Sequence, residues 1–377
     1  MSTPPRMNIA MISYYLPSEN KIGSGYQAHY MANALARRGH TVTMFSPVSR
    51  PDDALYALEQ IPVDTSNRLY RFAANLARVD WSRFNVVHAH GEDYRIHTRG
   101  NPIHVRTMHG SCLAESLHVP GLKEKIRMLF LGITELLAFH AADATVGVSC
   151  NTTRSYPWIK RVILNGVDTS MFTPGVSDLK SEISNLKSPD PTLLFVGTYQ
   201  NRKRGKLLME IFARDILPKI PTAKMWMVCS DAPAAPNVEV LGRLSTPELA
   251  DRFRRAWVFC LPSTYEGFGV PYIEAMASGT PVVASPNPGA KEVLANGKFG
   301  IVATDNELGP AIVKLLSSEP ERTKYRELGL QRAKEFEWNH IMAQYEKLYE
   351  ELQQNRTRSV SEAPELSPTI TAHPRRR

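Results

Sequence analysis

Short apolar runs alternate along the chain with longer stretches in which apolar residues recur every three or four positions. The first apolar run covers 8–13. A polar loop with glycines then leads to an amphipathic stretch over 26–38 and a second apolar run over 41–46. Short β-branched runs predict buried strands, and the three-to-four spacing predicts helices. This strand, loop, helix, strand order is a βαβ unit, which predicts a parallel sheet.

The same alternation continues through the first half of the chain. Strand-like runs cover 86–89, 104–108 and 145–149, and a helical pattern covers 122–140. Between 172 and 191, prolines and a glycine stand among serines, lysines and aspartates, which is typical of an inter-domain linker.

A second series of the same kind follows the predicted linker. It contains strand-like runs and helical patterns over 192–196, 207–215, 224–229, 311–317, 322–336 and 338–352. We therefore expect an α/β fold of two Rossmann-like domains, residues 1–172 and 173–337, with a ligand cleft where the strand ends of both sheets meet. Residues 353–377 are rich in Ser, Pro, Thr and Arg, and we expect them to form a disordered tail.

The stretch 262–285, PSTYEGFGVPYIEAMASGTPVVAS, has the most informative pattern. Glu266 precedes a glycine-rich turn, Pro271 opens a short helix that carries Glu274, and an apolar run follows. Proline suits the first turn of a helix, and the start of a helix presents unpaired N–H groups and a positive dipole end. The stretch therefore predicts an anion site flanked by two carboxylates, which suits a ligand with central phosphates and hydroxyls at both ends, such as a nucleotide-sugar.

The composition excludes several classes of protein. It is 43% hydrophobic and 22% charged, as in a soluble globular protein, and no apolar run approaches the roughly 20 residues that span a bilayer. The first residues lack a signal-peptide pattern, so we expect a cytoplasmic protein. The four cysteines form no C-x-x-C pair, which predicts neither a zinc site nor a disulfide framework. The formal charge of +8 would suit phosphorylated ligands or anionic membrane, but no signature of nucleic-acid binding is present.

With its motifs in this order, the chain resembles the retaining GT-B glycosyltransferases of glycosyltransferase family four, over roughly residues 8–352. EGFGVPYIEAMASGTPVVAS, from Glu266, looks like the family's E-x7-E motif. The other matching segments are GSGYQAHYMANALARRGHTVTMFSP (23–47), HVRTMHG (104–110), ILNGVDTSMFTP (163–174) and FEWNHIMAQYEKLYEEL (336–352). The resemblance implies a GT-B fold in which the helix at 338–352 crosses back to the first domain.

The resemblance also implies roles for the two acids. Glu274 would accept hydrogen bonds from the ribose diol, and Glu266 would contact hydroxyls of the donor sugar. One carboxylate can accept from two adjacent hydroxyls in a charge-assisted pair. Gly267, Phe268 and Gly269 would offer backbone N–H groups to the sugar and the diphosphate. The alternative is that both acids are solvated residues favoured by a helix dipole.

The basic loop GTYQNRKRGK, at 197–206, would neutralise the diphosphate as the sugar bond breaks. The family usually has arginine after the first glycine and lysine before the second, and here Thr198 and Arg204 stand at those positions. We expect Arg204 to supply the missing lysine's charge and Arg202 to reach into the site. A solvated loop is the alternative. The remaining donor-binding candidates are Ser24, Gly25, Thr198 and Leu244.

Histidines supply the candidates on the side of the first domain. His109 follows a predicted strand, and by the resemblance it lies beside the transferred sugar, so the predicted catalytic set is His109, Arg204 and Glu266. Tyr26, His88 and His90 are the acceptor-side candidates. No carboxylate or cysteine has ligand spacing to these histidines, and the chain has no D-x-D pair, so no metal site is predicted.

Two features have competing interpretations. GSGYQA fits the G-x-G-x-x-A pattern of dinucleotide-binding oxidoreductases, but its glycines lie about ten residues beyond the strand and no acid closes the second strand. The helix at 122–140 has an apolar side with Lys123, Lys125 and Arg127 near its start. It could lie on an anionic membrane, although we expect its apolar side to face the core of the first domain.

The predicted function is retaining, metal-independent transfer of a sugar from a nucleotide-sugar, with a UDP-sugar as the expected donor, to the hydroxyl of an unidentified acceptor. No cofactor is expected beyond this co-substrate. A nucleotide-sugar 2-epimerase of the same architecture is one alternative, and it would convert the donor without an acceptor. A catalytically idle nucleotide-sugar-binding protein is the other, and it would bind the donor without hydrolysing it.

Overall fold

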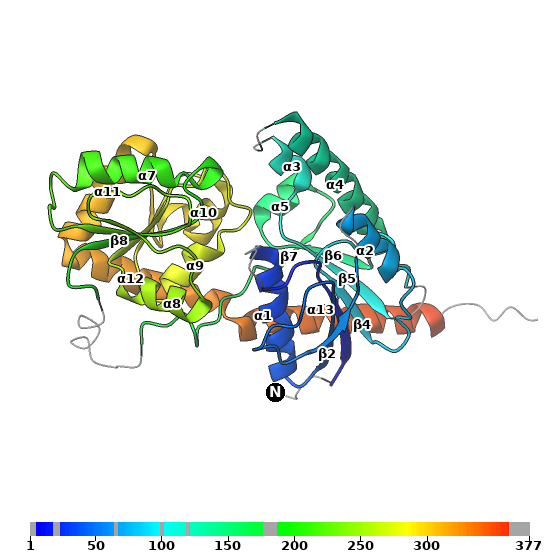
Figure 1. Cartoon of the computed structure of the whole chain (residues 1–377). Coiled ribbons are helices and arrows are strands. Elements are labelled where there is room, and N and C mark those ends of the chain that lie inside the picture. Colours follow the sequence, from blue (N-terminus) through cyan, green and yellow to red (C-terminus); the bar gives the residue numbers. More distant parts are fainter. Residues whose placement is uncertain are drawn as a thin grey trace, which may run out of the picture.

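The computed structural model describes residues 5–17, 23–63, 67–98, 102–117, 119, 121–175 and 187–361. Figure 1 shows two lobes, each built on a twisted sheet with helices around it. The predicted α/β fold of two Rossmann-like domains is confirmed.

The N-terminal lobe contains a seven-stranded sheet in the order β3-β2-β1-β4-β5-β6-β7. All of its strand pairs are parallel. Its strands are β1 (Asn8–Ile12), β2 (Thr41–Ser46), β3 (Ala57–Gln60), β4 (Val86–Ala89), β5 (Ile103–Met108), β6 (Ala144–Gly147) and β7 (Arg161–Val162). Its helices are α1 (Gly23–Arg37), α2 (Arg68–Leu76), α3 (Cys112–Ser116), α4 (Leu122–Ala141) and α5 (Cys150–Ser155).

The C-terminal lobe contains a six-stranded parallel sheet in the order β10-β9-β8-β11-β12-β13. Its strands are β8 (Thr192–Val196), β9 (Lys224–Val228), β10 (Val238–Val240), β11 (Val258–Leu261), β12 (Val282–Ala284) and β13 (Ile301–Val302). Its α-helices are α7 (Gly205–Ile211), α8 (Thr246–Arg255), α9 (Val270–Ala277), α10 (Pro288–Val293), α11 (Asp305–Ser317) and α12 (Glu319–Ala333). Helix α7 continues into one π-helical turn, Phe212–Ile216.

Both sheets reverse their strand order at one point, between β1 and β4 and between β8 and β11. In open parallel sheets, ligands bind beyond the carboxyl ends of the strands at this switch point. We therefore expect the site in the loops that follow β1, β4, β8 and β11, and in the neighbouring loop that follows β5.

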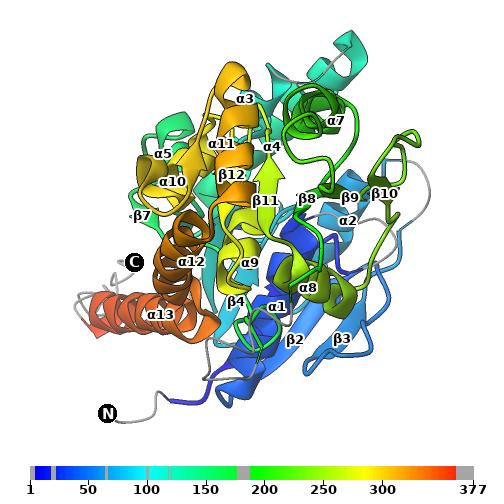
Figure 2. The ribbon, with the colours of Figure 1, turned by 90° about the vertical axis from the view of Figure 1, so that its left-hand side faces the viewer.

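The last helix, α13 (Trp338–Ser361), packs on the N-terminal lobe (Figures 1 and 2). Six of its large side chains join the core between β1, β2, β4 and α1: Trp338, Ile341, Met342, Tyr345, Leu348 and Tyr349. Glu346 also accepts two hydrogen bonds from the Arg38 guanidinium, at 2.6 Å each. The chain therefore crosses between the lobes twice, and the two crossings touch where Val167 N donates to Phe336 O at 2.8 Å.

Two expectations are wrong in part or in full, and another concerns residues that the structure does not describe. A disordered tail from residue 353 is wrong for 353–361, because α13 continues to Ser361 and Arg356 donates to Pro102 O at 2.8 Å and pairs with Asp143. Most of the expected linker, and residues 362–377, lie outside the described residues. The apolar side of α4 does not face the core: its buried residues are Met128, Gly132 and Ala138, and the large apolar side chains are exposed.

Candidate active site

The stretch that follows β11 forms a tight corner at the switch point of the C-terminal sheet. Gly269 has a φ of 98° and begins α9, with Pro271 in the first turn, and Gly279 ends the helix with a φ of 72°. A Cβ atom on Gly269 would also collide with the side chain of Tyr272. Glycine is required here because both the positive φ and the close packing exclude a side chain. The start of α9 therefore lies at the edge of the sheet where β11 ends.

Glu266 lies at this corner with its side chain only 7% exposed. Its Oε1 accepts hydrogen bonds from Lys203 Nζ at 2.7 Å and from Arg202 Nη1 at 3.3 Å. Burial alone would raise the pKa of this carboxyl, but the charges of Lys203 and Arg202 outweigh that effect and hold the pKa below its ordinary value. Glu266 is therefore a buried carboxylate that stays ionised at neutral pH.

Glu274 projects from α9 towards the N-terminal lobe. Burial raises the pKa of Tyr26 and of Tyr30 on α1, and the charge of Glu274 contributes to raising both. Tyr30 also crosses to the other lobe, where its hydroxyl lies 3.4 Å from Thr246 Oγ1. The side of α1 that carries Tyr26 and Tyr30 therefore faces α8 and α9 of the other lobe.

The basic loop between β8 and α7 has an unexpected conformation. Asn201 and Arg204 both have positive φ angles, 62° and 55°, which turn successive side chains in different directions. Lys203 consequently points to Glu266. The Arg204 guanidinium instead donates to Pro262 O at 2.6 Å, Asp305 Oδ2 at 2.8 Å and Ser285 Oγ at 2.8 Å.

This geometry changes the assignment of charges in the loop. The guanidinium of Arg204, the expected contact of the diphosphate, makes three contacts that fasten the loop to the ends of β11 and β12 and to α11. Lys203, which has no individual role in the sequence-based prediction, lies beside Glu266 instead. Thr198 is exposed and donates to Gln200 O at 2.9 Å, so it brings no charge to the site. Leu244 lies partly buried in the loop before α8.

Gly267 brings the corner against the N-terminal lobe. A Cβ atom built on this residue would lie 3.1 Å from the carbonyl oxygen of His109. Such a distance is tight for a real side chain, so the glycine permits a close approach of the two backbones. Phe268 points the other way, into the core, with its ring 5.8 Å from that of Phe336. The side chain of Phe268 therefore belongs to the core of the C-terminal lobe.

Three histidines form a row that ends at His109, beside the corner of the C-terminal lobe. The ring of His90 stacks between those of His88, at 4.9 Å, and His109, at 5.1 Å, and His90 Nδ1 lies 2.8 Å from His109 Nε2. Burial lowers the pKa of His109 to about 4, with a further contribution from the positive charge of Arg106. His109 is therefore a neutral imidazole at neutral pH, with one nitrogen that donates a hydrogen bond and one that accepts a hydrogen bond.

The expectation that His88 lines an acceptor pocket is wrong. Its side chain is fully buried beneath α13, where Nδ1 lies 2.5 Å from the Tyr349 hydroxyl and Nε2 lies 2.7 Å from Thr107 Oγ1. Burial lowers its pKa to about 3. His88 therefore supports His90 from behind and belongs to the core.

A small cavity of about 10 Å³ lies behind His109, lined in part by Gln27, His90 and Trp338. Each of these three side chains has a buried polar atom without a protein partner: Gln27 Oε1, His90 Nε2 and Trp338 Nε1. A cavity of roughly this size holds one water molecule, which could accept from the indole N–H and donate to the other two atoms.

Ser24 and Gly25 lie in the first turn of α1. A Cβ atom on Gly25 would come within 2.7 Å of the Tyr15 backbone, so this glycine lets the loop after β1 pack on the helix start.

Glu92, which the sequence does not single out, lies on the loop after β4 with a φ of 58°. Burial raises its pKa to about 7. A non-glycine residue with positive φ marks a constrained backbone, but sequence contains no signal for it.

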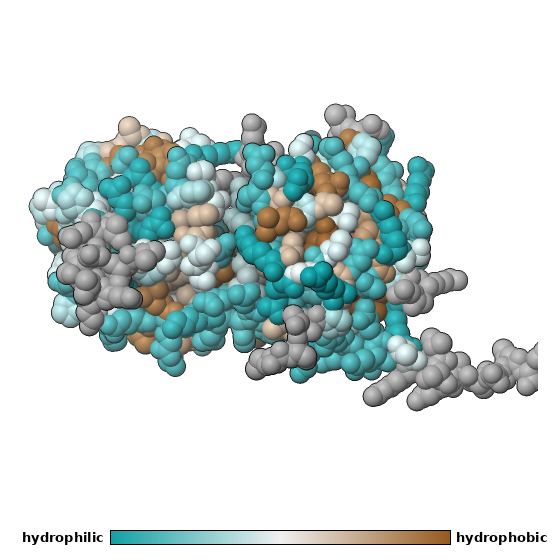
Figure 3. All heavy atoms as spheres, turned by 90° about the horizontal axis from the view of Figure 1, so that it is seen from below, coloured by the Kyte–Doolittle hydropathy of each residue, from teal (hydrophilic) through white to brown (hydrophobic). Residues whose placement is uncertain are grey.

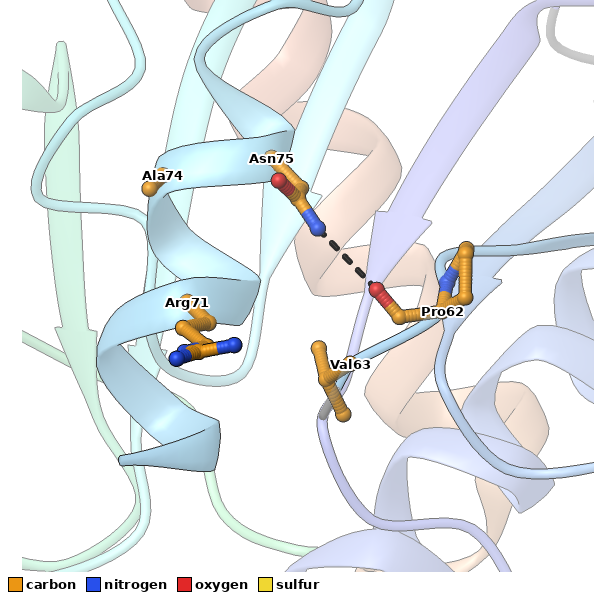
Figure 4. A pocket seen from close by; sticks show the side chains of 5 residues that line it. All are labelled: Pro62, Val63, Arg71, Ala74 and Asn75. Atoms are coloured by element: carbon orange, nitrogen blue, oxygen red, sulfur yellow. Dashed lines mark hydrogen bonds between the residues drawn. The ribbon is translucent and has the colours of Figure 1, made fainter. Parts of the chain in front are cut away.

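Other parts of the surface have less to offer. A hollow lined by Pro62, Val63, Arg71, Ala74 and Asn75 lies at α2, where Asn75 Nδ2 donates to Pro62 O at 3.0 Å, and it contains none of the predicted site residues (Figure 4). Within the described chain, no three His, Cys, Asp or Glu side chains are grouped as metal ligands would be. Among the described helices, none combines the length and the apolar composition needed to cross a membrane.

Comparison with known families decides the identity of the chain. Residues 23–171 match the family described as Glycosyltransferase Family 4, and residues 190–318 match Glycosyl transferases group 1. Together these matches span both lobes and more than half of the chain. The chain belongs to glycosyltransferase family 4. It is a glycosyltransferase, and the corner from Glu266 to Glu274 lies inside the second match.

Two curated relatives of this glycosyltransferase illustrate the range of similarity. The MMP alpha-(1->4)-mannosyltransferase of Mycolicibacterium hassiacum is 33% identical over 198 residues, which cover 50% of this chain and 47% of that protein. Our chain thus matches about half the length of that relative. The phosphatidyl-myo-inositol mannosyltransferase of Mycobacterium tuberculosis is 24% identical over 378 residues, which cover 91% of this chain and 97% of that protein.

Solved structures confirm the fold of the glycosyltransferase. Sucrose-phosphate synthase from Thermosynechococcus elongatus superposes with a TM-score of 0.74 at 22% identity, covering 93% of this chain and 100% of that one. HepE from Anabaena, in complex with UDP and glucose, superposes with a TM-score of 0.67 at 15% identity, covering 95% and 100%. At these identities the similarity concerns the fold alone.

Proposed function

We propose that this glycosyltransferase moves a sugar from a UDP-sugar to an acceptor hydroxyl in the cytoplasm, with retention of anomeric configuration and without a metal ion. The observation that carries the proposal is the meeting of the glycine corner at Gly267 with the backbone of His109. It sets the carboxylates of one lobe and the neutral histidine of the other around one place. The similarity to HepE, whose structure holds UDP and glucose, supports the nucleotide.

In this proposal each lobe has a separate task. Glu274 accepts from the ribose diol, the N–H groups at the start of α9 bind the diphosphate, and Glu266 accepts from hydroxyls of the donor sugar. Lys203 and Arg202 stabilise the negative charge that develops on the leaving diphosphate, a task that a metal ion performs in other transferases. His109 contacts the sugar from the opposite lobe as a neutral imidazole.

Retention follows in the proposal if the acceptor hydroxyl attacks from the face that the diphosphate leaves. The leaving phosphate oxygen then takes the proton of the acceptor hydroxyl, and the acceptor oxygen forms the new bond to the anomeric carbon. Glu266 cannot easily act as the base, because its charge is already shared with Lys203 at 2.7 Å. The anomer formed at early times, observed by NMR, tests this step, and an inverted product would overturn it.

The donor is tested by thermal unfolding in the presence of UDP-, GDP-, ADP- and dTDP-sugars. A donor at a hundredfold excess over its Kd stabilises the folded state by about 2.7 kcal/mol. We expect the largest rise in melting temperature with a UDP-sugar and the same rise after treatment with EDTA. A larger rise with another nucleotide would overturn the choice of UDP, and a rise abolished by EDTA would overturn the metal-independent mechanism.

A further inference from the structure

Helix α4 carries the largest group of exposed apolar side chains among the described residues. Leu122, Ile126, Leu129, Phe130, Ile133 and Leu137 are 45–73% exposed. Monomeric proteins rarely expose large apolar side chains in one continuous group, and such a group marks an interaction surface. Figure 1 shows α4 along an outer edge of the N-terminal lobe.

The six side chains lie on one side of the helix. At about 100° per residue they fall within roughly 100° of its circumference. The buried residues Met128, Gly132 and Ala138 lie on the other side, where α4 packs chiefly against α3 and β5. Gly132 permits this packing, because a Cβ atom there would collide with Leu113. The apolar stripe therefore points directly away from the protein.

Charge borders the stripe on both sides. On the same helical projection, Lys123 falls at one edge of the stripe and Lys125 at the other, and both are exposed. The single acid of the first turn, Glu124, lies on the far side and is paired with Arg127 at 2.8 Å. The border of the stripe is thus positively charged at the start of the helix. Lysines at such borders can extend their ammonium groups to a polar layer while their stems follow apolar surface.

We propose that this face of α4, the six apolar side chains with Lys123 and Lys125, docks the protein on an anionic lipid bilayer. A helix that lies in a bilayer interface has this combination of apolar and basic sides. The ammonium groups of Lys123 and Lys125 complement anionic headgroups at the start of the stripe. The proposal is independent of the donor and acceptor proposed above.

The position of α4 links this surface to the active site. Helix α3 begins three residues after His109, and the amide of its first residue, Cys112, donates to Glu135 of α4 at 3.1 Å. Tyr156 donates to the same carboxylate at 2.5 Å. The segment that follows His109 is therefore fastened to the inner side of the helix whose outer side meets the membrane. The face seen in Figure 3 lies on another side of the molecule and is largely hydrophilic, with separate apolar areas.

Vesicle flotation with the full chain tests the proposal. Vesicles of phosphatidylglycerol and phosphatidylcholine in equal parts should bind the protein at least about tenfold more than pure phosphatidylcholine, and high salt should reduce this binding. The variant L129S/F130S and the variant K123E/K125E should each bind the anionic vesicles at least about tenfold less. Two control variants, L55S and K219E/K298E, change exposed residues elsewhere and should bind like the wild type.

Thermal unfolding and donor hydrolysis of each variant show whether it is folded, and because the altered side chains are exposed, both should be unchanged. Absence of binding to anionic vesicles by the wild type would overturn the proposal. Equal binding by L129S/F130S would overturn it as well. A dimer in solution that L129S/F130S dissolves, without lipid binding by the wild type, would assign the face to a second copy instead. None of these outcomes changes the proposed sugar transfer, which the donor assay tests separately.

Discussion

Lys203 Nζ lies 2.7 Å from Glu266 Oε1, and the two side chains are only 18% and 7% exposed. This ion pair joins the loop after β8 to the loop after β11, at the switch point of the sheet. A buried charge without its partner costs several kcal/mol, so each of the two residues holds the other in place. The pair leads to the first two predictions.

Replacing Glu266 by Gln should reduce sugar transfer about 10²-fold. The amide keeps the shape but loses two charge-assisted hydrogen bonds to donor hydroxyls, together worth about 3 kcal/mol. The rate of product formation at saturating donor measures the effect. Glu239, on β10, is exposed, so Glu239→Gln is the matched control and should be fully active. Activity of Glu266→Gln within a few-fold of the wild type would contradict the assignment.

Replacing Lys203 by Met should lower kcat/KM for the donor by about 10–100-fold, because a charge that stabilises the departing diphosphate is removed. Methionine fills much of the same buried space, and Glu266 keeps its contact with Arg202, so the fold should persist. Lys206→Met, exposed in the first turn of α7, should have little effect. Steady-state kinetics of both variants measures kcat/KM for the donor. An equal loss of kcat/KM in both variants would show that the positive charge of this region matters, but not the position of Lys203.

Replacing Gly267 by Ala should impair catalysis more than stability. The new Cβ atom would lie 3.1 Å from His109 O, so the lobes would have to separate by a few tenths of an ångström. A small displacement of reacting groups is costly, and we expect a loss in kcat/KM of about tenfold. The melting temperature of the free enzyme, measured in parallel, should change little. A large fall in melting temperature with normal kinetics would place the role of Gly267 in folding alone.

Acid should destabilise the protein through His88. Its pKa is about 3 in the folded protein, against about 6.5 in an unfolded chain, so the unfolded chain binds the extra proton between these values. The contribution of His88 to the free energy of unfolding is therefore complete above about pH 6.5 and falls as the pH is lowered. At about pH 5 the loss is about 2 kcal/mol.

Urea unfolding at about pH 7.5 and pH 5 measures this effect. His88→Asn removes the titrating group, so its stability should differ less between the two pH values than that of the wild type. His97→Asn, on an exposed loop residue, should leave the difference unchanged. An unchanged difference in His88→Asn would show that other groups carry the acid sensitivity.

The backbone of the site could be predicted because local chemistry dictates it. Gly269, Pro271 and Gly279 are residues whose conformational limits select a turn, a helix start and a helix end, and the structure has all three there. The position of His109 beyond β5 could be predicted as well, since the loops after parallel strands gather at one edge of a sheet. The roles of these residues towards a ligand remain predictions.

The direction of side chains could not be predicted in the same way. Whether Lys203 or Arg204 faces Glu266 depends on positive φ angles at Asn201 and Arg204 and on partners more than 50 residues away, such as Pro262 and Asp305. Likewise, the spacing of apolar residues in α4 shows that one side is apolar but not that it faces solvent. His88 and His90 stand two positions apart in the sequence VHAHG. The sequence does not show that His88 is buried beneath α13, which comes more than 240 residues later.

The return of α13 to the first lobe has a consequence for the order in which the protein folds. His88 and Tyr349, which touch in the finished structure, are separated by 261 positions in the chain. A ribosome must therefore have passed position 349 before the N-terminal core can close. The C-terminal lobe draws its core from residues up to Phe336 and can form earlier. We expect the N-terminal lobe, although it is made before the C-terminal lobe, to be completed after it, with an apolar sheet face that has to be kept from aggregating until α13 has been made.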